Sequence, residues 1–94
     1  MVNVRFTRHL VRFFPGLERT EVEGSTVAEV IGALDTKYPG LADYIVDERG
    51  TLRRHVNIFV SQEMIHDRQT LSDPVQDGDE MYVFQALSGG SSIK

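Results

Sequence analysis

The stretch DGDEMYVFQALSGG, residues 77–90, contains the turn, the strand and the glycine pair that decide the fold. Asp and Gly at its start favour a sharp reversal, because they supply side-chain-to-backbone hydrogen bonds and a positive φ. An apolar strand is expected over residues 81–87, ahead of Gly89 and Gly90. Two glycines near a chain end indicate only a flexible segment when taken alone. Their meaning therefore depends on the rest of the chain.

Two strands are expected near the N-terminus. Residues 2–6 alternate apolar and polar side chains, which is typical of a half-buried strand. Residues 17–23 favour a second short strand, with Thr20 and Val22 on one face. Strands so close together in sequence indicate an antiparallel hairpin.

An amphipathic helix is predicted after residue 26. Thr26 followed by Glu29 resembles an N-cap with a carboxylate reaching back, and Pro39-Gly40 ends the pattern. The apolar side chains recur at helical spacing, so this face should pack on the sheet. The expected core combines helix and strand residues: Val27, Val30, Ile31 and Leu34 with Val4, Phe6 and Ile58.

The next segments predict a helical turn and a strand. Leu41, Tyr44 and Ile45 suit a short helical turn before a loop. Residues 55–60 form the clearest strand pattern in the chain and are expected to be central in the sheet. Alternation places Phe59 on the face opposite the core.

Composition indicates one small globular domain. The chain has 94 residues, with 40% hydrophobic and 26% charged residues. Its net charge is −4, and its basic residues are spread along the chain, which argues against a nucleic-acid partner and favours a basic partner surface. The short cluster Arg53-Arg54-His55, with Arg49 nearby, is interpreted as a solvated loop. No stretch resembles a membrane span or a signal peptide, so a cytoplasmic protein is expected.

The chain lacks the residue sets that catalysis or metal binding needs. Without cysteine there is no disulfide, no cysteine-ligated zinc and no thiol nucleophile. His9, His55 and His66 are scattered without metal-ligand spacing, and Asp77 and Asp79 lack the further ligands of a calcium loop. No catalytic triad or phosphate-binding loop is found. We therefore expect no enzyme activity, no cofactor and no metal.

The order strand, strand, helix, strand, strand indicates an α+β fold, a ubiquitin-like β-grasp with a mixed sheet of four to five strands and one main helix packed on one face. The turn at 77–80, the strand after it and Gly89-Gly90 resemble the ending of the ThiS/MoaD family of ubiquitin-like sulfur carriers. Residues 54–60 further resemble the CysO-like branch. On this basis, residues 1–88 form the domain and residues 89–94 a flexible diglycine tail with a four-residue extension.

The resemblance implies a carrier function. In the family, an E1-like adenylyltransferase activates the carboxylate of the last glycine with ATP, and the resulting thiocarboxylate delivers sulfur to a biosynthetic enzyme. Gly89 and Gly90 suit passage through a narrow channel, because they have no Cβ. Ser91–Lys94 follow Gly90 here, so the carrier reading requires cleavage of the Gly90-Ser91 bond, for which the family has JAMM-type peptidases. The alternative is a ubiquitin-like interaction or modifier module without sulfur transfer.

Strand alternation also predicts a partner-binding surface. Phe59, Tyr82 and Phe84 should face away from the helix, and exposed aromatic side chains on a small domain indicate an interaction site. We expect them to form a docking patch for the activating enzyme, with Asp79 and Glu80 at its rim. Cover by a loop or a homodimer is the alternative.

Overall fold

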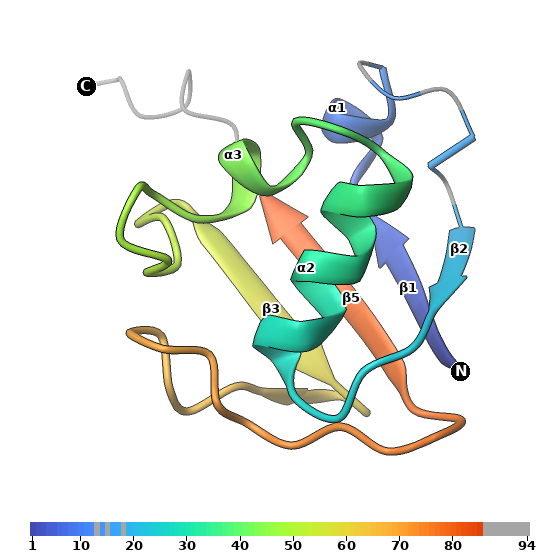
Figure 1. The fold of residues 1–94 in the computed structure, drawn as a ribbon, viewed down its shortest axis with the longest axis vertical. Helices are drawn as coiled ribbons and strands as arrows, with labels where there is room; N and C mark the ends of the chain where they lie inside the picture. The colour runs from blue at the N-terminus through green and yellow to red at the C-terminus, as the bar shows by residue number, and fades with distance from the viewer. Residues whose placement is uncertain (13, 15, 18, 86–94) are drawn as a thin grey trace.

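The computed structural model describes residues 1–12, 14, 16–17 and 19–85, with the side chains of residues 9 and 10 left out (Figure 1). It confirms the α+β β-grasp: one main helix crosses one face of a mixed sheet. The elements in chain order are β1 (Val2–Phe6), α1 (Arg8–Val11), β2 (Arg19–Val22), α2 (Val27–Lys37), α3 (Ala42–Ile45), β3 (Val56–Val60), β4 (Glu63–Met64) and β5 (Glu80–Gln85).

The sheet has five strands in the order β2-β1-β5-β3-β4. β1 pairs antiparallel with β2 and parallel with β5, and β3 pairs antiparallel with both β5 and β4. The expectation that the strand at 55–60 is central was wrong, because β5 takes that place and β3 lies beside it. Alternation reports which face of a strand is buried and carries no information about which strands flank it.

The core lies between α2 and the inner face of the sheet. Val27, Val30, Ile31 and Leu34 are all buried, and they pack with the buried Val4, Phe6 and Ile58, as the sequence predicted. The hydroxyl of Thr20 is also on this side, where it accepts a hydrogen bond from Lys37 Nζ at 2.8 Å. The polar atom of β2 that is buried here is therefore satisfied within the fold.

The start of α2 is held by the predicted cap. Thr26 Oγ1 accepts a hydrogen bond from Glu29 N at 3.2 Å, and Glu29 Oε1 accepts one from Ser25 N at 2.8 Å. Gly24 allows the close approach of chain and helix, since a Cβ there would lie 2.9 Å from the backbone nitrogen of Val30. These contacts fix where the chain leaves β2 and enters the helix.

Two elements were not predicted from the sequence. Helix α1 is four residues long, too short for a 3.6-residue period to be recognised. β4 follows a two-residue turn in which Ser61 and Gln62 have φ of 50° and 75°. Such turns usually carry Asn-Gly or Asp-Gly, so a Ser-Gln turn has no sequence signal.

The loop between β4 and β5 is organised around the Asp67 carboxylate. It accepts hydrogen bonds from the backbone N–H groups of Gln69 and Thr70, each at 3.0 Å, and from the Ser72 hydroxyl at 2.6 Å. The Ser72 hydroxyl, followed by the Thr70 hydroxyl and its backbone N–H, holds the pKa of Asp67 well below its usual range. The ionised carboxylate thus orders this loop.

The first prediction concerns the core. Leu34 is completely buried, so Leu34→Ala should lower the free energy of unfolding by about 2 to 5 kcal/mol, because it leaves a cavity under the sheet. Thr36→Ala, an exposed change on the same helix, serves as the control and should alter stability by less than about 0.5 kcal/mol. Urea unfolding followed by circular dichroism measures both. A loss for Leu34→Ala that matched the control would contradict the packing of α2.

The second prediction concerns acid stability. Because the folded pKa of Asp67 is depressed, its carboxylate stabilises the fold above the unfolded pKa of about 4, and this contribution disappears as the pH falls below that value. Asp67→Asn should be less stable than the wild type at neutral pH and lose less of its Tm between about pH 4 and pH 2. Glu63→Gln, on exposed β4, should follow the wild-type profile. Parallel profiles for all three proteins would rule out a stabilising role for the Asp67 carboxylate.

Candidate functional site

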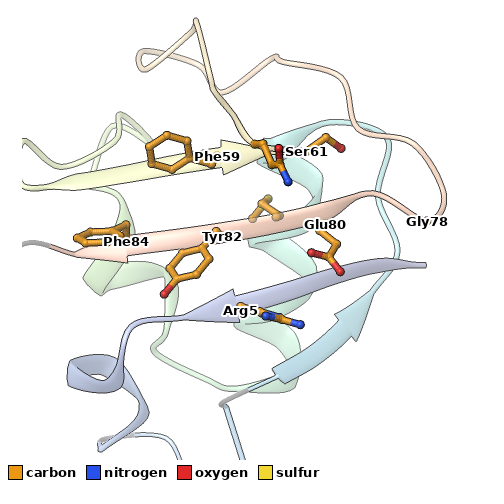
Figure 2. A pocket seen from close by; sticks show the side chains of 9 residues that line it. Arg5, Phe59, Ser61, Gly78, Glu80, Tyr82 and Phe84 are labelled. Carbon is orange, nitrogen blue, oxygen red and sulfur yellow. The ribbon is translucent and has the colours of Figure 1, made fainter.

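The candidate site is the outer face of the sheet, opposite α2 (Figure 2). Register places Arg5 beside Tyr82, Tyr82 beside Phe59 and Phe59 beside Met64, in one row across four strands. Cross-strand neighbours share a face, so these side chains project to the same side. Figure 2 shows Arg5, Phe59 and Tyr82 on neighbouring strands of this face.

Aromatic side chains occupy the middle of this face. Tyr82 is 40% exposed and Phe84 is 46% exposed, whereas Phe59 is half-buried. The rings of Tyr82 and Phe84 lie 6.0 Å apart between centroids, which is within the range of favourable aromatic pairs. The structure thus places all three predicted aromatic residues together, and we call Phe59, Tyr82 and Phe84 the aromatic patch.

The aromatic patch lines a groove of about 630 Å³. Its walls come from β1, β3 and β5 and from the two turns at their ends. The lining residues are Arg5, Phe59, Ser61, Gln62, Gly78, Glu80, Met81, Tyr82 and Phe84. Figure 2 shows the aromatic side chains toward one end of the groove and the polar side chains toward the other. A mainly apolar lining with a few polar groups is the usual composition of a binding site.

The two acidic residues predicted at the rim, Asp79 and Glu80, differ in exposure and in hydrogen bonding. Asp79 is half-buried, and its oxygens accept hydrogen bonds from the Ser61 hydroxyl at 3.1 Å and from Gln76 N at 2.8 Å. It therefore connects the turn after β3 to the turn before β5. Glu80 is exposed and lines the groove, so its carboxylate is accessible there.

The groove follows the strand that leads to the C-terminus. Gln85 is the last described residue of β5 and pairs with Val56 on β3. The predicted tail residues Gly89 and Gly90 and the predicted cleavage position Ser91 lie outside the described residues. Covalent geometry alone limits Gly90 to roughly 18 Å from Gln85.

Metal sites and membrane spans were also sought among the described residues. No three His, Asp or Glu side chains of the described residues are grouped so that they could hold a metal ion. Within the same ranges, every helix is too short or too polar to cross a lipid bilayer. Arg54 and His55 are exposed, and Arg53 Nε donates to the carbonyl of Asp43 at 2.8 Å, which fits a loop cluster.

Among the residues of this face that were not singled out from the sequence are Met64 and Arg5. Met64 is 48% exposed and lies next to Phe59. Its place on this face could not be predicted, because the turn before β4 was not recognised in the sequence. Arg5 lines the groove, and the alternation of β1 does assign it to the outer face. Its neighbour Tyr82, however, is 77 positions away in the sequence, and only the parallel pairing brings the two together.

The chain is similar in sequence and in fold to several known small proteins. Sulfur carrier protein CysO of Mycobacterium tuberculosis is 31% identical over 77 residues, 80% of this chain and 83% of the relative. Small archaeal modifier protein 3 of Haloferax volcanii is 30% identical over 69 residues, 72% of this chain and 73% of the relative. A chain in the crystal structure of the Amycolatopsis orientalis BexX/CysO complex superposes with a TM-score of 0.84, at 28% identity, over 96% of this chain and 100% of that chain.

The family match is nearly as long as the chain. It extends over residues 4–90 and therefore includes the outer face of the sheet and both glycines of the tail. The prediction of a carrier protein rather than an enzyme is confirmed by this family and by relatives named as sulfur carriers. Taken with the β-grasp fold, these similarities show that the chain belongs to the ThiS family of ubiquitin-like sulfur carrier proteins.

Proposed function

We propose that this protein carries sulfur on the carboxylate of Gly90, after Ser91–Lys94 have been removed. The observation that carries the proposal is the extent of the family match, which ends at residue 90 and leaves the last four residues outside it. A carboxylate at Gly90 exists only after cleavage of the Gly90-Ser91 bond. A JAMM-type peptidase is a suitable class of enzyme for that cleavage, and the cytoplasm is the proposed location.

The proposed chemistry has two steps. A Gly90 carboxylate oxygen attacks the α-phosphorus of ATP on an E1-like adenylyltransferase, forming the acyl-adenylate and releasing pyrophosphate. A sulfide-level donor then attacks the acyl carbon and displaces AMP, which leaves a thiocarboxylate. A sulfur-accepting biosynthetic enzyme receives the sulfur. The absence of cysteine fits this route, because the sulfur is bound to an acyl carbon and no side-chain thiol is required.

The aromatic patch is the proposed docking site for the activating enzyme. Tyr82 and Phe84 combine large apolar area with exposure, which is typical of residues that dominate binding energy. Glu80 lies at one end of the groove and offers a charge for orienting the partner. Two residues of the patch lie on β5, which ends five residues before Gly90 in the sequence, so docking there would also bring the carboxylate close to the enzyme.

The third prediction tests this docking site. The double variant Phe59→Ser and Phe84→Ser should lose adenylation by the cognate E1-like enzyme, because it removes the apolar centre of the interface. Phe84→Ser alone tests the same patch at an exposed residue, where folding is least affected. Tyr44→Ser, an exposed aromatic change on α3, is the control and should retain adenylation. Release of pyrophosphate measures the rate, and normal adenylation of the folded double variant would exclude the patch.

The fourth prediction tests the end of the chain. Protein ending at Gly90 should accept AMP and then exchange one carboxylate oxygen for sulfur, both visible as changes in intact mass. Full-length protein should react only after Ser91–Lys94 are removed, because four extra residues of roughly 13 Å separate its carboxylate from Gly90. Protein ending at Gly89 is the matched control and should react poorly. Equal reaction of the full-length and Gly90 forms without proteolysis would contradict the proposal.

A modifier function is the second candidate, since one relative is named Small archaeal modifier protein 3. In that case the activated Gly90 carbonyl would form an isopeptide bond with a lysine of another protein. Mass spectrometry distinguishes the two functions: conjugation produces branched peptides on lysines, whereas sulfur carriage produces the thiocarboxylate alone.

A further inference from the structure

Two arginines stand side by side on the outer face of the sheet. Arg5 on β1 is directly opposite Arg19 on β2 in the antiparallel register, and both side chains are exposed. Their strand neighbours Val4 and Thr20 are buried, so alternation sends both arginines to the face that carries the groove. Like charges directly opposite each other destabilise a strand pair. The stability of the sheet therefore does not explain why two arginines occupy these positions.

No acidic group of the described residues forms an ion pair with these two arginines. Within residues 1–12, 14, 16–17 and 19–85, no carboxylate oxygen lies within 4 Å of either guanidinium, and the ion pair found there joins the amino group of Met1 to Asp77. Glu21 and Glu80 lie on the same face, both in register with Asn3, one row further along from Arg5. As far as the described residues show, the two positive charges thus have no carboxylate partner, and an acidic group of another protein could pair with them.

The arginine pair continues the row of the aromatic patch. Arg5 lines the groove and is in register with Tyr82, which is in register with Phe59. A partner that covers the aromatic side chains must therefore also approach Arg5 and Arg19. Covering these charges without an opposite charge costs free energy, whereas a carboxylate can accept bidentate hydrogen bonds from a guanidinium.

We propose that Arg5 and Arg19 bind an acidic side chain of the activating enzyme when it docks over the groove. This inference rests on the proposed function and specifies the chemistry of the partner. It also revises the expectation of a basic partner surface: the partner is acidic opposite the arginine pair and basic only opposite Glu80. Such alternation fixes one orientation of the carrier, because the reversed orientation would bring like charges together.

The test measures adenylation of the Gly90-ended protein by its cognate E1-like enzyme over a range of salt concentrations. Arg5→Gln and Arg19→Gln should each raise the KM for the carrier about tenfold with kcat unchanged, because they remove docking charges and leave the tail intact. Both variants should also weaken the dependence of kcat/KM on salt. Arg49→Gln removes an exposed arginine from the loop after α3 and should leave KM within about twofold.

Thermal unfolding of the same variants separates docking from a structural role. Arg5→Gln and Arg19→Gln should be at least as stable as the wild type, since each relieves a like-charge contact. Unchanged KM and salt dependence, with normal activation of the wild type, would overturn the inference and leave the proposed function standing. A KM increase matched by Arg49→Gln, or one accompanied by unfolding, would also overturn it. If the Gly90-ended wild type is not activated at all, the proposed function fails and the inference with it.

Discussion

The parallel pairing of β5 with β1 is the interaction on which the rest of the structure depends. It extends from Asn3 beside Glu80 to Phe6 beside Val83. Parallel neighbours cannot be joined by a tight turn, so the chain must cross over the sheet between them, and α2 makes that crossing. Because β5 also pairs with β3, it lies in the middle of the sheet with both edges hydrogen-bonded.

This central position gives the two faces of β5 different roles. Met81 and Val83 are 1% and 0% exposed and complete the core under α2, whereas Tyr82 and Phe84 project from the other face. A strand with no free edge cannot accept a partner strand, so recognition through β5 must use its outward side chains. β5 is also the last described element before Gly90 in the sequence. The proposed docking surface and the proposed carrier residue Gly90 are therefore linked through this one strand.

The net charge of the chain and the charge at the groove lead to different expectations about a partner. The net charge of −4 suggested a basic partner, yet several carboxylates are engaged in holding turns. Asp47 accepts hydrogen bonds from Arg49 N and Thr51 N, Asp67 orders the loop before β5, and both oxygens of Asp79 are bonded. Arg5, in contrast, is exposed at the groove. The charge at this face therefore depends on where the fold places individual charged groups, and the net charge of the chain does not predict it.

The sequence by itself determined the main helix and the faces on which the strand side chains lie. Period-two alternation predicted the outward direction of Phe59, Tyr82 and Phe84, and helical spacing with the Thr26 cap predicted α2. These features could be predicted because each depends on residues only a few positions apart.

Only the tertiary structure decided the strand order, the addition of β4 and its Met64, and the meeting of Arg5 with both Arg19 and Tyr82. Each of these depends on the register between strands that are distant in sequence. Register follows from the packing of the common core and from turn geometry. The residue types of Ser61 and Gln62 are not typical of the tight turn that they form, so the sequence did not predict it. Local periodicity predicts which face of the sheet a side chain lies on. Its neighbours on other strands are known only from the folded sheet.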